Sequence, residues 1–213
     1  MDFLPEKIDE YVTAHSQPEP ELLQELNRET WAKVLQPRML SGHFQGRVLS
    51  MISKIVNPLN ILEIGTYTGY SALCLAEGMK KEGQLHTIDI NEELYDLQRK
   101  YFDKSGYGKQ IIQHTGDALE IIPNLDLKFD LAFIDADKNN YIRYFEMILP
   151  KMNRSGIILS DNVLWSGKVI EEIKNDDIDT PVLIEYNQLL NNHPAIETVL
   201  LPIRDGLTVS RLL

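Results

Sequence analysis

The stretch ILEIGTYTGYS, at residues 61–71, decides how this chain folds. Its apolar, β-branched start predicts a short strand that is buried on both faces, and a helix is expected to begin near Tyr70. Between them, Gly65 and Gly69 allow a sharp turn and a close approach to a ligand, toward which the free amide groups of the helix also point. By itself the pattern fits a plain strand-to-helix turn as well as a cofactor-binding turn.

The turn lacks the glycines of a dinucleotide-binding site. A G-x-G-x-x-G fingerprint would need glycine in place of Tyr67 and Tyr70, because bulky side chains there keep a pyrophosphate away from the backbone. Glu63 lies at the end of the predicted strand and suits an amine or hydroxyl of a nucleoside without phosphate. The turn therefore predicts a nucleoside-type cofactor other than NAD.

Composition narrows the class of protein. The 213 residues suit one domain, which we divide into N-terminal helices with a lid loop, residues 1–57, and a cofactor-binding core, residues 58–213. The formal charge of −11 disfavours nucleic acid as a partner, since such binders rely on lysine and arginine. The N-terminus lacks a basic segment followed by an apolar run, so we expect no signal peptide, no membrane span and a cytoplasmic protein. The single cysteine, Cys74, lies among apolar helix residues and is expected to be buried.

Strand and helix patterns alternate along the rest of the chain. This alternation predicts an α/β, Rossmann-like, doubly wound and mostly parallel sheet of seven strands, with extra N-terminal helices and a C-terminal antiparallel hairpin. Lys80 and Lys81 favour a helix end near residue 81. After the first strand, further strands are expected at 85–88, 110–114, 129–134, 156–159, 196–201 and 207–212. Helices are expected at 6–14, 21–35, 44–56, 71–81, 92–104, 118–122, 141–149 and 181–191.

Acidic side chains recur where the predicted strands end, which is where ligands bind in such sheets. Each one alone would more often be a helix cap or a turn residue. Together they predict a site, and its members are Glu63, Asp89, Asp117, Asp135, Asp137 and Asp161, with Asn162 beside the last.

Two chemistries separate within this set. Asp89 follows the glycine turn by about a helix and a strand, the spacing at which an acid binds ribose hydroxyls. Asp135, Asp161 and Asn162 come from adjacent strands and offer oxygen atoms alone, which suits Mg²⁺. Lys138 follows Asp135 by one helical turn, so its amine could act as a base beside a metal. The alternative for Lys138 is a solvated surface lysine.

Four motifs in this order resemble the cation-dependent O-methyltransferases, the group that contains the catechol and caffeoyl-coenzyme A enzymes. The resemblance runs from about Met39 to the C-terminus. The motifs are EIGTYTGYS at 63–71, DADKxxY at 135–141, DNxLWxG at 161–167 and DG at 205–206.

The resemblance implies a methyltransferase that uses S-adenosylmethionine, a divalent cation and a small aromatic acceptor, and that forms a homodimer. Mg²⁺ is the expected metal, with Ca²⁺ and Mn²⁺ as alternatives, held by Asp135, Asp161 and Asn162. Lys138 would be the general base beside the catalytic Asp135. Asp89 would bind the ribose and Asp117 and Ala118 the adenine. The other cofactor contacts would be Met39, Ser41, Glu63, Gly65, Thr66, Tyr67, Ser71, Asp135 and Asp137, and Trp165 would line the acceptor pocket.

One segment departs from the coenzyme A-dependent members. Residues 169–180 carry Glu171, Glu172, Asp176, Asp177 and Asp179 against Lys174 alone, which should repel the phosphates of coenzyme A. We therefore expect a free catechol-like acceptor, with Arg38 as a contact for an acceptor carboxylate. The alternatives are a caffeoyl-coenzyme A-type ester, a dinucleotide-dependent oxidoreductase, a nucleic-acid or N-methyltransferase, and a cofactor-binding protein without catalysis.

Overall fold

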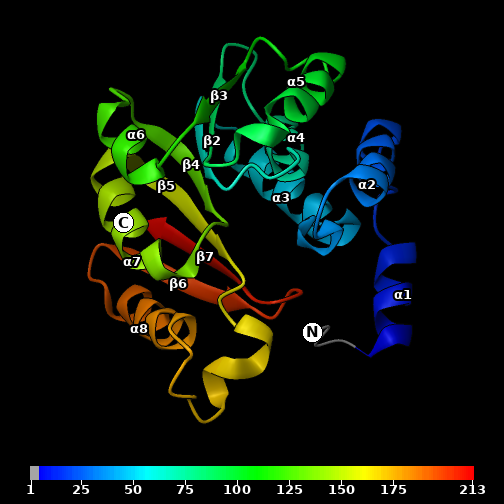
Figure 1. Ribbon diagram of the computed structural model, residues 1–213. Helices are drawn as coiled ribbons and strands as arrows, with labels where there is room; N and C mark the ends of the chain where they lie inside the picture. The colour runs from blue at the N-terminus through cyan, green and yellow to red at the C-terminus, as the bar shows by residue number, and fades with distance from the viewer. Residues whose placement is uncertain (1–4) are drawn as a thin grey trace.

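Strand β1, Asn60–Ile64, lies between β2 and β4 inside a mixed sheet, in a computed structural model that describes residues 5–213 (Figure 1). The strand order is β3-β2-β1-β4-β5-β7-β6. Strands β1 to β5 are parallel, whereas β7 runs antiparallel to both β5 and β6. The predicted fold, with its C-terminal hairpin, is confirmed. The other strands are β2 Gln84–Asp89, β3 Ile111–Thr115, β4 Phe129–Ile134, β5 Met152–Asp161, β6 Ile196–Leu201 and β7 Leu207–Leu212.

Helices cover both faces of the sheet and enclose two apolar clusters. Helices α3, α4 and α5 pack on one face with α2 beside them, and α6, α7 and α8 pack on the other (Figure 1). Within residues 5–213, none of the helices combines the length and apolar content needed to cross a membrane. The α-helices are α1 Glu6–Ala14, α2 Glu21–Lys33, α3 His43–Val56, α4 Tyr70–Ala76, α5 Tyr95–Lys104, α6 Ala118–Asn124, α7 Tyr141–Ile148 and α8 Asp179–Asn192. The 3₁₀ turns are η1 Pro37–Met39, η2 Glu92–Leu94, η3 Lys138–Asn140, η4 Leu149–Lys151 and η5 Trp165–Ile170.

Because side chains alternate between the two faces along a strand, the acids at the ends of β1 and β5 lie on the same face of the sheet. Ile61 of β1 and Leu159 of β5 belong to the cluster under α3, α4 and α5. Because side chains two residues apart share a face, Glu63 and Asp161 point to that same side. The two acids thus meet the helical layer that contains α3.

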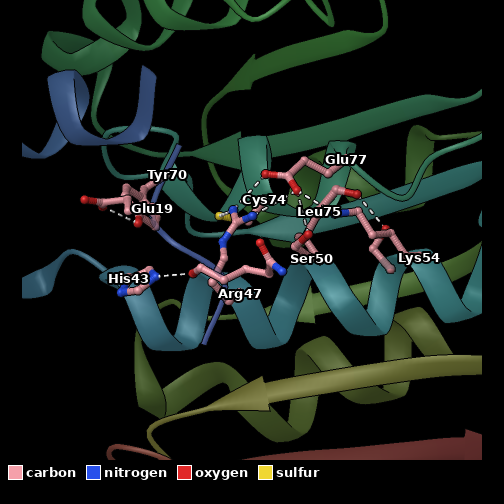
Figure 2. Close-up of polar contacts among 11 residues, drawn as sticks. Glu19, His43, Arg47, Ser50, Lys54, Tyr70, Cys74, Leu75 and Glu77 are labelled. Atoms are coloured by element: carbon pink, nitrogen blue, oxygen red, sulfur yellow. Dashed lines mark hydrogen bonds and ion pairs between the residues drawn. The ribbon is translucent and has the colours of Figure 1, made fainter. Parts of the chain in front are cut away.

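Helix α3 is joined to α4 by a partly buried ion cluster of Arg47, Ser50, Lys54 and Glu77, the Glu77 cluster (Figure 2). Arg47 donates hydrogen bonds to both carboxylate oxygens of Glu77, at 3.0 and 2.7 Å, and Ser50 and Lys54 donate to Oε2 at 2.7 and 2.9 Å. Burial would raise the pKa of Glu77, but these donors outweigh it and lower the pKa to about 2. Cys74 is fully buried beside Arg47, as predicted, and burial raises its pKa to about 12.

Several element ends differ from those expected, and the ends of α4 and β5 matter most for the structure around the site. Helix α4 ends at Ala76 and does not reach Lys81, so Lys80 does not lie in its last turn. The chain leaves the helix at Gly78, where a Cβ atom would lie 2.2 Å from the backbone nitrogen of Lys54 in α3. Strand β5 extends through residue 161, because β7 pairs with it as far as that position. Asp161 is therefore held by the sheet itself, and the flanking loop begins after it.

Candidate active site

A large cavity opens at the carboxyl ends of β1, β2, β4 and β5. Its volume is about 1210 Å³. Every site residue predicted from the sequence lines it except Glu63. The chain order reverses between β1 and β4, the position at which ligands bind in open α/β sheets.

The glycines of the 61–71 turn serve contacts within the protein. Gly65 has φ +96°, and a Cβ there would lie 1.8 Å from the carbonyl oxygen of Asp135. Gly69 has φ +90°, and its Cβ would lie 2.6 Å from the ring of Phe102 in α5. The glycines therefore permit a close approach to β4 and α5. The sequence could not reveal these partners, which are distant along the chain. Gly65 also lines the cavity, so its contact with a ligand stays a prediction.

Asp89 shapes the turn as well as the cavity wall. Its Oδ2 accepts a hydrogen bond from the backbone nitrogen of Tyr67 at 2.6 Å, and its Oδ1 accepts one from Asn91 at 2.8 Å. Tyr67 is held in the left-handed region, with φ +48°. The side chain of Gln98 donates to the carbonyl oxygen of Tyr67 at 2.7 Å, a contact that no sequence motif indicated. Each oxygen of Asp89 keeps a further lone pair that can face a ligand.

Glu63 lies beneath the turn, not on the cavity wall. Its side chain is fully buried, and Oε2 accepts a hydrogen bond from Thr87 at 2.5 Å. Thr87 in turn lies 2.5 Å from the hydroxyl of Thr66 in the turn. Oε1 is buried without a hydrogen-bond partner, and burial raises the pKa of Glu63 to about 8. Glu63 thus reaches the turn through these two threonines.

Lys138 is buried, so the alternative of a solvated surface lysine is wrong. Its side chain is 7% exposed, because the η3 turn folds it back toward Asp135 and the rings of Tyr141 and Trp165 flank it. The amine donates to the hydroxyl of Tyr141 at 2.5 Å, to Oδ1 of Asn162 at 2.9 Å and to Oδ1 of Asp135 at 3.4 Å. Three predicted site residues are therefore joined in one network.

Tyr141 completes this network and carried no role in the sequence interpretation, although it ends the 135–141 motif. Its ring is fully buried at the start of α7, and its hydroxyl donates to the carbonyl oxygen of Asp161 at 2.9 Å. The hydroxyl thus ties the amine of Lys138 to the end of β5. Its position in the motif was the available signal.

One carboxylate oxygen of Asp161 is free to bind a cation. Its Oδ2 accepts from Gln45 at 2.5 Å, whereas Oδ1 is buried without a partner. Burial and the nearby charge of Asp135 raise its pKa, because both disfavour a second negative charge. Residues 5–213 hold no group of three His, Cys, Asp or Glu side chains arranged for a metal. The set at this corner consists of two carboxylates and the amide oxygen of Asn162, and it fits a hard cation.

Asp117 and Asp137 lie on the cavity wall and also support local structure. Asp117 caps α6 by accepting from the backbone nitrogen of Leu119 at 2.8 Å. Asp137 accepts from the hydroxyl of Tyr144 at 2.5 Å and from the side chain of Asn140 at 2.6 Å. These bonds fix the direction of both carboxylates along the wall.

The N-terminal loop closes one side of the cavity. Arg38 and Met39 are exposed in η1, whereas Ser41 is buried just before α3. Arg204, in the turn between β6 and β7, donates to the carbonyl oxygens of Leu40, at 3.1 Å, and Ser41. Arg204 also lines the cavity and was not predicted from the sequence.

Comparison with known proteins agrees with this arrangement. Residues 13–213 match the family model described as O-methyltransferase. The chain is 36% identical over 209 residues to a caffeoyl-CoA O-methyltransferase of Petroselinum crispum, covering 91% of this chain and 84% of that protein.

This chain belongs to the O-methyltransferase family. Among solved structures it is similar to an O-methyltransferase from Bacillus cereus in complex with SAH, with 29% identity, a TM-score of 0.89 and 97% of each chain covered. It is also similar to the O-methyltransferase TomG from Streptomyces achromogenes in complex with SAM, with 25% identity, a TM-score of 0.87, and 97% of this chain and 96% of that chain covered. The predicted class, an S-adenosylmethionine-dependent O-methyltransferase, is confirmed. The oxidoreductase alternative finds no support in these comparisons.

Proposed function

We propose that this O-methyltransferase transfers the methyl group of S-adenosylmethionine to one hydroxyl of a small, free, vicinal dihydroxy aromatic acceptor. A divalent cation, Mg²⁺ by preference, would be held by Asp135, Asp161 and Asn162. The observation that carries the proposal is the buried amine of Lys138, which lies 2.9 Å from Oδ1 of Asn162 and 3.4 Å from Oδ1 of Asp135.

The cavity has room for a donor and an acceptor together. Its volume of about 1210 Å³ exceeds the roughly 300–1,000 Å³ of most single-ligand pockets. In this proposal Asp89 binds the ribose, and Asp117 and Ala118 bind the adenine. The backbone of the turn at 65–71 and the loop residues Met39 and Ser41 hold the rest of the cofactor. The acceptor then lies between the sulfonium group and the corner that contains Lys138.

The cation site is supported by the chemistry of its donors. Asp161 offers a buried oxygen without a hydrogen-bond partner, and burial and the charge of Asp135 raise its pKa, although Lys138 offsets part of this repulsion. A divalent cation would stabilise the two carboxylates further. A bound divalent cation would orient the two acceptor oxygens and make one hydroxyl more acidic.

The residues of the chain then perform the remaining steps. In this proposal Lys138 accepts the proton of the reacting hydroxyl at Nζ, and the hydroxyl of Tyr141 helps to hold Nζ beside Asn162. S-adenosylmethionine would supply the methyl group, which the acceptor oxygen would take while the electron pair of the C–S bond remained on sulfur. Because the sulfonium would lose its positive charge, the ring of Trp165 on the cavity wall would favour the transition state by excluding water.

The acceptor is proposed from the charge at the cavity mouth. Asp179 lines the cavity, and Glu171, Glu172 and Asp176 are exposed on the segment just before it. These acids disfavour the phosphates of coenzyme A. The competing acceptor is a caffeoyl-coenzyme A-type ester, which is favoured by the name of the Petroselinum crispum relative and by Arg38 at the cavity wall. In our proposal Arg38 meets a carboxylate of the free acceptor.

The test is methyl transfer from labelled S-adenosylmethionine to catechol, caffeic acid and caffeoyl-coenzyme A, with and without EDTA. We expect transfer to the free catechols, loss of transfer with EDTA and recovery with Mg²⁺. Transfer that survives both EDTA and Asp161→Ala would refute the cation site. A kcat/KM for caffeoyl-coenzyme A equal to or above that for caffeic acid would refute the free acceptor alone. The homodimer and the cytoplasmic location stay predictions, which gel filtration with light scattering and cell fractionation can test.

A further inference from the structure

A hydrogen-bond relay that starts at the partly buried Arg204 links the N-terminal loop to the buried Asp161. Nη1 of Arg204 donates to Oε1 of Gln45 at 3.0 Å, and Nε2 of Gln45 donates to Oδ2 of Asp161 at 2.5 Å. Gln45 is 1% exposed in the first turn of α3 and does not line the cavity. It can therefore act on the site only through its neighbours.

The chemistry of the three groups fixes the direction of the Gln45 amide. A guanidinium only donates hydrogen bonds and a carboxylate only accepts them. The amide must therefore turn its oxygen to Arg204 and its NH₂ group to Asp161. With Oδ2 engaged in this way, the rotation of the carboxylate is set, and the oxygen without a partner is Oδ1.

The same guanidinium nitrogen holds the loop that closes the cavity. Nη1 of Arg204 also contacts the carbonyl oxygens of Leu40 and Ser41, so its two hydrogens are shared among three acceptors. Arg204 itself has φ +48°, in the tight turn between β6 and β7 that leads directly into the strand paired with β5. One side chain therefore contacts the loop, the amide of Gln45 and, through that amide, Asp161.

We propose that Gln45 is a positioning residue for Asp161, and that Arg204 couples the placement of the N-terminal loop to the orientation of that carboxylate. Ordering of the loop around the cofactor then prepares Asp161 to bind the cation. This inference rests on the proposed function, because it needs a cation at Asp161.

The test measures binding, not turnover alone. Mg²⁺ is titrated by calorimetry into wild type, Gln45→Met and Arg204→Met, each saturated with S-adenosylhomocysteine, and the affinity for S-adenosylhomocysteine is measured separately. Removal of a group that orients a metal ligand typically weakens metal affinity by about 10- to 100-fold. We expect a loss of that size in both variants. Only Arg204→Met should also weaken S-adenosylhomocysteine, because Leu40 and Ser41 lose their donor only there.

The double variant tests the order of the relay. If Arg204 acts on Asp161 through Gln45, Mg²⁺ should bind to Gln45→Met/Arg204→Met about as well as to Gln45→Met. If the losses of Mg²⁺ binding free energy in the two single variants add up in the double variant, Arg204 does not act through Gln45 and the relay is refuted.

Matched controls change the same residue types elsewhere. Arg211→Met removes an arginine of β7 that pairs with Glu197, and Gln110→Met removes a glutamine that donates to the carbonyl oxygens of Lys80, Lys81 and Gly83. Both controls should keep wild-type Mg²⁺ affinity. If wild type fails to bind Mg²⁺, the proposed cation site fails; if wild type binds it and Gln45→Met binds it equally well, the present inference alone fails. Arg204→Met, on a turn outside the core, keeps the test decisive should Gln45→Met not fold.

Discussion

Glu77 and Asp161 both accept hydrogen bonds from side chains of helix α3, but their carboxylates differ in the number of donors and in the direction of the pKa shift. In the Glu77 cluster, three side chains of α3 donate to one carboxylate, and the pKa of Glu77 is lowered to about 2 (Figure 2). At the cavity, Gln45 donates to one oxygen of Asp161, the other oxygen has no partner, and burial together with Asp135 raises the pKa of Asp161.

The number of hydrogen-bond donors around each carboxylate distinguishes an acid that stabilises the fold, Glu77, from an acid that is available to a ligand, Asp161. A carboxylate that already has hydrogen bonds to both oxygens and two cationic partners, as Glu77 has, gains little from a further ligand. A buried carboxylate that lacks a partner gains from a cation or a hydroxyl, so such groups gather at functional sites. Glu63 also has an unpartnered Oε1 and a raised pKa of about 8, but it lies beneath the turn and not on the cavity wall.

The largest effect is expected from Asp161→Asn. Loss of a charge that holds the cation should lower kcat/KM by roughly 10³-fold, since several kcal/mol of transition-state stabilisation are involved. The free energy of unfolding should stay level or rise, because an incompletely paired buried carboxylate is removed. Steady-state kinetics and urea unfolding check the two expectations. Lost stability with retained activity would place Asp161 with Glu77 in the structural class.

Lys138→Met should lower kcat by roughly 10²- to 10³-fold, the usual contribution of a positioned base. The KM for S-adenosylmethionine should change little, because the amine contacts Asp135, Asn162 and Tyr141 in the cation and acceptor corner. Exposed Lys174→Met is the matched control. If kcat of Lys138→Met stays within about threefold of wild type, the amine is not the base.

Glu77→Gln should show the reverse pattern. It leaves Arg47 and Lys54 without their anion, and we expect a loss of about 2 kcal/mol in the free energy of unfolding, below the loss for a fully buried pair because Lys54 is half-exposed. Activity at a temperature where the variant is folded should match wild type. Thermal and urea unfolding measure the loss, with exposed Glu172→Gln as control. An unchanged free energy of unfolding would show that the Glu77 cluster does not stabilise the fold.

The smallest effect is in the pH dependence of stability, where the two acids have opposite signs. The pKa of Glu63 is about 8 in the folded protein and 4.5 as the reference value for the unfolded chain. Between pH 4.5 and 8, Glu63 is therefore protonated in the folded state and ionised in the unfolded state. Its contribution to the unfolding free energy therefore falls as pH rises from about 4.5 to 8, with a slope of at most about 1.4 kcal/mol per pH unit. Glu77, lowered from 4.5 to about 2, contributes stability above pH 4.5 that is lost as pH falls toward 2.

Urea unfolding across pH, for wild type, Glu63→Gln and Glu77→Gln, resolves these two contributions. Glu63→Gln should flatten the decline between pH 4.5 and 8 and leave the acid limb unchanged. Glu77→Gln should act on the acid limb alone. A profile of Glu63→Gln parallel to wild type would mean that Glu63 is ionised in the folded protein.

Much of the fold followed from local patterns. Alternating strand and helix signals, the buried run at β1 and the 196–212 hairpin were all predicted, because periodicity and turn residues act within a few positions. The end of α4 was predicted wrongly, since it depends on the approach of Gly78 to the backbone of α3. The site residues were named from their positions at strand ends and from motifs, and all except Glu63 line the cavity.

By itself, the sequence determined the order of the elements, the edge of the sheet where the acids gather and the O-methyltransferase family. Tertiary structure alone decided how each acid is used. It buried Lys138 against Tyr141 and gave both oxygens of Glu77 hydrogen-bond donors. It left one oxygen of Asp161 and one of Glu63 without partners. It also brought Arg204 and Gln45 together from opposite ends of the chain. The physical reason is that hydrogen-bond partners and desolvation are set by neighbours in space, and no local pattern in the sequence encodes those neighbours.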